Sequence, residues 1–187
     1  MIFAAFRELE TPRLRLRALQ REDAADYFSR LAGSEAVTRY MLFSPHRDIS
    51  ESVASVEKTL RRYEAGGCYR WCITEKDCDR LIGVIDLLRL DPLTDSCSFA
   101  YMLGQDCWGR GYGTEALRAV LDFAFHDLLV QEVTADHMAE NAASGAVMRK
   151  AGMEYVSTEY GKYEKNGQRY DAPVYRITRG KINAGNS

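Results

Sequence analysis

The chain has 187 residues, of which 46% are hydrophobic and 28% are charged, close to the average for globular proteins. This composition excludes a disordered chain, a collagen and a coiled coil, and the length suits one domain. The 25 basic and 27 acidic residues give a net charge of −2, so we expect no nucleic-acid partner.

The N-terminal segment, MIFAAFRELE, is too short an apolar run for a signal peptide or a membrane span. No later apolar run approaches the ~20 residues that a span requires, so we expect a cytoplasmic protein without a membrane partner. The five cysteines are an odd number, and none forms a C-x-x-C pair. We therefore expect reduced thiols and no metal site.

The first elements are a strand and a helix. Apolar and basic residues alternate over 14–18, which predicts a half-buried strand whose arginines, at 13, 15 and 17, face water or a partner. Apolar residues then recur at helical spacing from Ala24 to Leu31, and Gly33 is expected to end that helix.

A second helix is predicted to begin at Asp48, because Glu51 three residues later completes a capping-box pattern. The pair Gly66-Gly67 stops it. Three strands should follow, over residues 68–74, 81–89 and 96–103.

The third helix has the clearest periodicity in the chain. Its apolar stripe consists of Leu117, Val120, Leu121, Ala124, Phe125 and Leu128. The remaining predicted elements are a strand over 132–137, a helix over 144–151 closed by Gly152, a hairpin of strands 155–165 and 169–178 around Asn166-Gly167, and a frayed tail over 180–187.

The predicted order is therefore β-α-α-β-β-β-α-β-α-β-β, without a repeat or a linker. We expect a single α/β (α+β) domain over residues 1–187, with its core over 11–178. Its sheet should be mixed, mostly antiparallel and twisted, with helices packed against it.

One segment, Trp108–Thr114, carries a chemical signal. Its three alternating glycines lie between a predicted strand and the third helix, where the chain can turn tightly and approach a ligand closely. Free N–H groups at the start of that helix would bind an anion such as a pyrophosphate. An ordinary glycine-rich turn is the alternative.

Two other phosphate-binding motifs fit this segment poorly. A Walker A loop requires Gly-Lys-Ser/Thr, which the sequence lacks. A dinucleotide fingerprint requires a third glycine where Thr114 stands, although Asp136 follows at about the ribose-binding distance. That motif usually opens its domain, whereas this loop lies past the midpoint, so a nucleotide-binding oxidoreductase is the last alternative.

The run FAYMLGQDCWGRGYGTEALRAVLDFAF, followed by HMAENAASGAVMRKAGMEY, resembles the GCN5-related N-acetyltransferase (GNAT) superfamily. It is most similar to the subgroup of ribosomal-protein N-acetyltransferases. The predicted order of elements over roughly residues 11–178 is similar to that family's fold. The resemblance implies an acetyltransferase whose co-substrate is acetyl-CoA.

The resemblance also implies roles for particular residues. Asn141 would hydrogen-bond the pantetheine, and Ser144 would lie near the thioester sulfur. The backbone of the strand at Tyr101, Met102 and Leu103 would bind the pantetheine at a point where the strand splays from its neighbour. The pyrophosphate would be bound by the backbone N–H groups of Trp108, Gly109, Arg110, Gly111, Tyr112, Gly113 and Thr114, with Trp108 in place of the family's usual Gln or Arg.

Direct attack by an amine on the thioester is the implied mechanism, with both reactants bound. A backbone N–H of Met102 or Leu103 would polarise the carbonyl. Many relatives protonate the leaving thiolate with a Tyr, but that position is Met148 here. Ser144 is therefore the candidate acid, and a helix N-cap is its alternative role.

The resemblance supplies no general base, because the Glu that relatives carry on the fourth strand is Ser98 here. Glu75, Asp86 and Asp171 are possible substitutes, and solvated carboxylates are their alternative role. Asp171 is favoured, because it follows Tyr170 in the hairpin that borders the acceptor side.

An active site without the family's Glu and Tyr should prefer an acceptor amine that is often neutral. About a tenth of an α-amine with a pKa near ~8 is neutral at pH 7, against one in ~2,500 for a lysine side chain. We therefore expect the acceptor to be a protein N-terminal α-amine. A polyamine or aminoglycoside acetyltransferase and a non-catalytic acyl-CoA-binding module are the alternatives, and the protein is expected to be a monomer or a homodimer.

Overall fold

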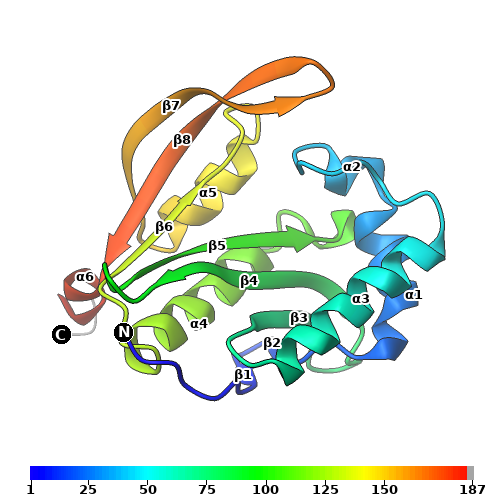
Figure 1. The fold of residues 1–187 in the computed structure, drawn as a ribbon, viewed down its shortest axis with the longest axis horizontal. Helices are drawn as coiled ribbons and strands as arrows, with labels where there is room; N and C mark the ends of the chain where they lie inside the picture. The colour runs from blue at the N-terminus through cyan, green and yellow to red at the C-terminus, as the bar shows by residue number, and fades with distance from the viewer. Residues whose placement is uncertain (185–187) are drawn as a thin grey trace.

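A computed structural model describes residues 1–184 and places eight strands in one sheet, in the order β1-β2-β3-β4-β5-β6-β8-β7 (Figure 1). Neighbouring strands are antiparallel except β5 and β6, which are parallel. The strands are β1 (Leu9–Glu10), β2 (Leu14–Arg17), β3 (Tyr69–Glu75), β4 (Leu81–Asp91), β5 (Ser96–Leu103), β6 (Glu132–Asp136), β7 (Glu154–Lys165) and β8 (Gln168–Thr178). The predicted mixed, mostly antiparallel sheet is confirmed; only the two-residue strand β1 was not predicted.

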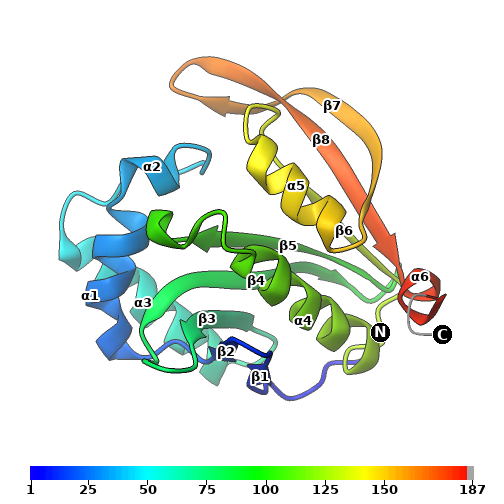
Figure 2. The same ribbon diagram turned by 180° about the vertical axis from the view of Figure 1, so that it is seen from behind.

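Helices cover both faces of the sheet. They are η1 (Arg21–Asp23), α1 (Ala24–Asp26), η2 (Tyr27–Ala32), α2 (Glu35–Thr38), α3 (Ile49–Glu64), η3 (Gln105–Cys107), α4 (Tyr112–His126), α5 (Ala142–Lys150) and α6 (Arg179–Ala184). The segment η1-α1-η2 and helix α3 lie against one face, and α4 and α5 lie against the other (Figures 1 and 2). The sheet therefore has two separate hydrophobic cores.

The larger core lies beneath α4 and α5 and is rich in aromatic side chains. Trp71 is fully buried there, and its ring meets that of Phe123 edge-on at 5.2 Å. Truncating such a side chain to alanine typically costs about 3–5 kcal/mol. The smaller core, beneath α1 and α3, includes Tyr27, Leu31 and Val56. These two cores fix the sheet between its helices and leave the strand ends free to form a site.

The feature of the sheet that matters most for function is a split between β5 and β6. The two strands pair only from Ser96↔Glu132 to Ser98↔Thr134, and beyond these residues they diverge (Figure 1). The remainder of β5, as far as Leu103, still pairs with β4. One edge of β5 is thus left without a neighbouring strand, which is the splay that the family resemblance implied.

Two expectations were wrong. Arg17 does not face water: its guanidinium is buried and forms a bidentate ion pair with Asp23, with both N···O distances at 2.8 Å. The expected frayed tail begins as helix α6, which continues directly from β8; residues 185–187 of that tail lie outside the described residues.

The short helix α2 was also not predicted, because four residues are too few to show a periodicity. All five cysteines are free, and all except Cys78 are buried. In the described part of the chain, none of the helices combines the length and the apolar character that a membrane crossing requires.

Candidate functional site

The glycine segment forms the entry to helix α4. Gly109 and Gly111 have positive φ angles of 72° and 83°, a conformation that costs a glycine little. Gly111 is the N-cap, and the first helical hydrogen bond runs from the N–H of Glu115 to its carbonyl at 3.1 Å. The N–H groups of residues 112–114 thus belong to the first turn, where a helix offers no backbone acceptor. This arrangement suits a bound phosphate.

Charged side chains hold this loop in place. Arg13 donates to the carbonyl of Arg110 at 3.0 Å and forms an ion pair with Glu115 at 2.6 Å. The guanidinium groups of Arg13 and Arg110 lie 4.6 and 4.8 Å from the centre of the Tyr112 ring. The Tyr112 hydroxyl donates to Glu75 at 2.8 Å. Two cations therefore lie beside the free N–H groups, and the Glu75 carboxylate stabilises the loop through Tyr112.

Trp108 fixes the end of β5. Its indole Nε1–H donates to the carbonyl of Leu103 at 2.8 Å, while about half of the side chain (48%) stays exposed. The residue that replaces the family's usual Gln or Arg thus ties the glycine segment to the strand beside the split.

The register of β5 determines which of its backbone groups face the split. The N–H of Gly104 donates to the carbonyl of Ile82 in line with β4. Since N–H groups alternate in direction along a strand, the N–H of Met102 also faces β4, whereas those of Tyr101 and Leu103 face the split. Of the two donors expected for the thioester carbonyl, Leu103 therefore faces the gap and Met102 does not.

Helix α5 forms the other side of the split. Its N-cap is Asn141, whose Oδ1 accepts from the N–H of Ser144 at 3.3 Å. The amide nitrogen of Asn141 remains able to donate to a ligand. The alternative role of Ser144 as a helix N-cap is wrong, because the helix begins two residues earlier than predicted and Ser144 is its third residue.

Ser144 and Tyr101 meet across the split. Ser144 is 7% exposed, and burial raises the pKa of Tyr101 while a hydrogen bond with the Ser144 side chain opposes that rise. A Cβ added to Gly113 would lie 3.5 Å from the Tyr101 ring, so the ring also approaches the first turn of α4. Met148, at the position of the family's Tyr, is buried in the core. The split thus contains two hydroxyl groups but no tyrosine from α5.

Asp171, the favoured base in the sequence analysis, lies in β8, and its carboxylate is hydrogen-bonded within the hairpin. Its Oδ1 accepts from the N–H of Gly161 at 2.7 Å, and its carbonyl accepts from the N–H of Ala139 at 2.9 Å. The first bond joins β8 to an irregularity in β7, and the second joins β8 to the segment after β6. The structure therefore brings together residues 101–103, 108–114, 141 and 144 around the split, and gives the Asp171 carboxylate a backbone partner.

A further cluster lies at the end of β6. The carboxylate of Asp136 accepts from Lys162 at 2.7 Å and from the hydroxyl of Tyr163. The sequence alone suggested Asp136 only as a ribose ligand, because Lys162 and Tyr163 follow it by 26 and 27 residues and no local pattern connects them.

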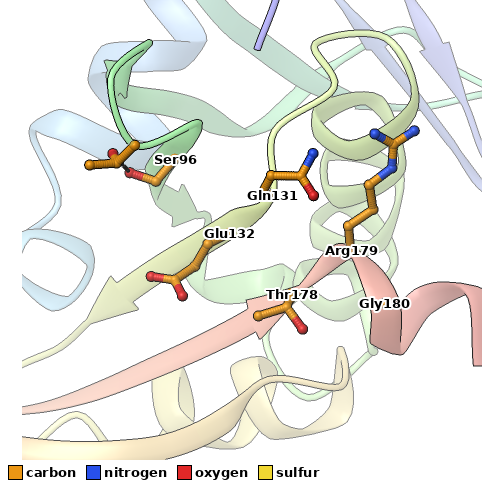
Figure 3. A pocket seen from close by; sticks show the side chains of 7 residues that line it. Ser96, Gln131, Glu132, Thr178, Arg179 and Gly180 are labelled. Atoms are coloured by element: carbon orange, nitrogen blue, oxygen red, sulfur yellow. Dashed lines mark hydrogen bonds between the residues drawn. The ribbon is translucent and has the colours of Figure 1, made fainter.

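Two open hollows lie outside the split. One, of about 540 Å³, is formed by polar residues where β5 and β6 begin, including Ser96, Gln131 and Glu132 (Figure 3). Ser96 and Leu103 are opposite ends of β5, so this hollow is remote from the glycine segment. The other, of about 770 Å³, runs beside α4 and reaches Gly111. Within residues 1–184 no group of three or more His, Cys, Asp or Glu side chains could hold a metal ion.

Comparisons with known proteins agree with this geometry. A family model of the acetyltransferase (GNAT) domain matches residues 13–154. The uncharacterized N-acetyltransferase YoaA of Bacillus subtilis is 27% identical over 171 residues, which cover 91% of this chain and 96% of YoaA.

Solved structures show the same fold. A Vibrio cholerae protein, provisionally assigned as a ribosomal-protein-serine acetyltransferase, is similar with a TM-score of 0.81 at 19% identity, over 94% of this chain and 99% of the other. The microcin C7 self-immunity acetyltransferase MccE, solved with acetyl-CoA and AMP, is similar with a TM-score of 0.79 at 19% identity, over 90% and 93% of the two chains.

Proposed function

Because this chain belongs to the GNAT acetyltransferase domain family, we propose that it transfers the acetyl group of acetyl-CoA to the α-amine of a protein N-terminus. The observation that carries the proposal is the split between β5 and β6, which opens beside the free N–H groups at the start of α4. Ribosomes release such N-termini in the cytoplasm, where the five unpaired cysteines would stay reduced, so we place the protein there.

In this mechanism the backbone binds the acetyl donor. The N–H groups of residues 109–114 receive the pyrophosphate, with Arg13 and Arg110 beside them. The pantetheine lies along the free edge of β5 and is met by the Asn141 side chain from α5. Binding both reactants in one site converts a bimolecular attack into a positioned one.

The same edge supplies the chemistry of the thioester. The N–H of Leu103 faces the split and is oriented to stabilise the carbonyl oxygen as it gains charge. Ser144 donates the proton to the leaving thiolate. The Tyr101 hydroxyl beside it either orients the Ser144 hydroxyl or donates the proton in its place.

A small amine such as a polyamine or an aminoglycoside is the second candidate acceptor. The observation that favours it is a carboxylate, Asp136, at the open end of the split, because these substrates are polycations. However, Lys162 forms an ion pair with this carboxylate at 2.7 Å, which reduces the negative charge available to a polycation. An N-terminal amine, with one charge, therefore fits better.

A thiol-release assay tests the proposal. Purified protein and acetyl-CoA are incubated with peptides bearing a free N-terminus, the same peptides blocked at the N-terminus but containing lysine, polyamines and aminoglycosides. We expect the highest kcat/KM for the free N-termini. Equal or faster acetylation of lysine side chains would contradict the N-terminal assignment, and tight CoA binding without thiol release from any amine would favour a non-catalytic acyl-CoA-binding module.

A further inference from the structure

A row of residues crosses the sheet on the face opposite α4 and α5. The register pairs Arg70 with Asp86 and Asp86 with Ala100. Asp136 lies two residues beyond Thr134, as Ala100 lies two residues beyond Ser98, so Asp136 stands across the split from Ala100. Ala100 is exposed although β5 lies in the middle of the sheet. The small, exposed side chain thus leaves open space between two carboxylates.

The alternation of side chains places all of this row on one face. Val84 and Met102 belong to the core beneath α1 and α3, so Asp86 and Ala100, which are two residues away from them on the same strands, point to that face. On β6, Ala135 belongs to the opposite core, so its neighbour Asp136 also points to the α1 and α3 side. An amine that enters from this side meets both carboxylates.

The two carboxylates differ in their hydrogen-bond and ion-pair partners. Asp136 accepts hydrogen bonds from Lys162 and Tyr163, one on each carboxylate oxygen. The nearest cation to Asp86 is Nη1 of Arg70, at 3.6 Å, beyond hydrogen-bond distance. Among the described residues we find no hydrogen bond to the Asp86 carboxylate, whose side chain is 12% exposed. Asp86 is therefore the carboxylate that is free to accept a proton.

We propose that Asp86 is the general base of the reaction and accepts a proton from the ammonium group of the acceptor, which enters the open space above Ala100. This inference rests on the proposed acetyl transfer and supplies the base that Ser98 cannot. Opposed Cβ atoms on neighbouring strands lie about 4.5–5.5 Å apart, so Asp86 reaches the space above Ala100, beside the free edge of β5.

Acetyl transfer removes two protons from the nitrogen of the acceptor ammonium. The acceptor ammonium gives one proton to the Asp86 carboxylate, and the resulting neutral amine attacks the thioester carbon. The C–N bond forms and the C–S bond breaks, with the electron pair leaving on sulfur. Ser144 gives its proton to the thiolate, and the nitrogen gives its second proton to the Ser144 oxygen, which restores the hydroxyl. Asp86 returns its own proton to water when the product leaves.

The surroundings of Asp86 suit this role. Burial raises the pKa of its carboxyl group, and the cations Arg70 and Arg62 oppose that rise. Three other titratable groups lie nearby: Tyr27 of η2, Tyr63 of α3 and Cys68 before β3. Because a raised pKa brings a carboxylate closer to the working pH, it makes Asp86 a stronger base. Activity should fall as the pH drops through this pKa, since protonated Asp86 cannot accept a proton.

The test compares wild-type protein with Asp86→Asn, using an N-terminal peptide over pH 5–9. We expect kcat/KM near neutral pH to fall by about 100-fold, with acetyl-CoA affinity unchanged. The fall of kcat/KM at acid pH that Asp86 causes should be absent from the variant. The difference in kcat/KM between the two proteins should shrink toward pH 9, where the peptide amine is already neutral. Asp77→Asn, in the exposed turn between β3 and β4, is the matched control and should keep the wild-type profile.

A second variant, Ala100→Leu, fills the open space above residue 100 without removing a charge. It should raise KM for the peptide at least fivefold while the acetyl-CoA affinity stays within twofold. The Asp86 assignment is overturned if wild-type protein acetylates the peptide and Asp86→Asn, folded and binding acetyl-CoA, keeps the wild-type pH profile; an unchanged KM in Ala100→Leu counts equally against it. Wild-type protein that releases no thiol with any amine would overturn the proposed function itself.

Discussion

The two sides of the split between β5 and β6 are built differently. On the side of α4, the groups that we propose for acetyl-CoA are mainly backbone N–H groups, at residues 109–114 and at Leu103. On the side of α1 and α3, the groups that we propose for the acceptor are side chains, chiefly Asp86 and Asp136.

This difference explains why the family is evident and the acceptor is not. A backbone site needs glycines and a helix start, so many sequences can build it as long as the turn is kept. A side-chain site depends on which residues the sheet register brings together, and a single substitution on one strand changes it. Variants on each side should therefore have separate effects, on acetyl-CoA binding or on the acceptor.

Removal of both hydroxyl groups at the split should slow the chemical step most. The double variant Ser144→Ala, Tyr101→Phe should lower kcat by about 100-fold, since a positioned proton donor contributes at least that much. Acetyl-CoA affinity, measured by calorimetry, should change by less than twofold, because the backbone binds the cofactor. Each single variant should lose less, and a wild-type kcat in the double variant would leave both hydroxyls without a catalytic role.

A β-branched residue at Gly111 should weaken the binding of acetyl-CoA. The φ angle of 83° there costs an L-residue about 1–2 kcal/mol, and a Cβ would lie 3.4 Å from the Arg13 guanidinium. We expect Gly111→Val to raise the dissociation constant of acetyl-CoA about tenfold or more. Gly180→Val, which has open space and an ordinary φ angle, is the matched control. Equal affinity in the two variants would show that the loop conformation is not needed.

Loss of a contact at the hairpin tip should affect only the acceptor. The Lys165 ammonium donates to the carbonyls of Thr38, Arg39 and Met41 at 2.8, 3.1 and 2.7 Å, and so ties the hairpin β7–β8 to the loop after α2. We expect Lys165→Met to raise KM for a peptide about threefold, with acetyl-CoA affinity unchanged. Lys58→Met, on the exposed side of α3, should change neither constant. A rise in the acetyl-CoA dissociation constant without a change in KM for the peptide would show that this contact supports acetyl-CoA binding and not acceptor binding.

The smallest effect should come from Glu115, which joins α4 to the start of β2. Partial burial opposes its ionisation, but hydrogen bonds from Thr11 and Arg13 outweigh it and lower the pKa of Glu115 below its ordinary value of 4.5. A lowered pKa stabilises the fold above that ordinary value, and this stabilisation is lost as the pH falls through the folded-state pKa. We expect Glu115→Gln to cost about 1 kcal/mol at pH 7.

Thermal unfolding at several pH values measures this difference. At pH 7 it corresponds to a fall in Tm of about 2–4 °C, and it should narrow in acid below pH ~4. A gap that stays constant down to pH 3 would mean that the carboxylate charge contributes nothing.

Much of the fold follows from local patterns. Periodicity predicts α4 and the strands β3, β4 and β5 to within a few residues, since each buries one regular face. The turn Asn166-Gly167 predicts the hairpin, because both residues adopt the positive φ angles that such a turn requires. Where local signals are weak the predictions were wrong: Arg17 is buried by a distant pairing with Asp79 as well as by Asp23, and α5 starts at a cap, Asn141, that the sequence analysis had assigned to the ligand alone.

The sequence alone points to the GNAT family and to the residues that we propose for acetyl-CoA, because these depend on a contiguous glycine segment and on one helix start. The groups that we propose to face the acceptor can be recognised in the tertiary structure alone. Asp86 and Asp136 are 50 residues apart in the sequence. They lie on either side of Ala100 only because of the register of three strands and the split in the sheet. A pattern of neighbouring letters cannot specify such a row, since each strand contributes one side chain and the sheet alone sets their order.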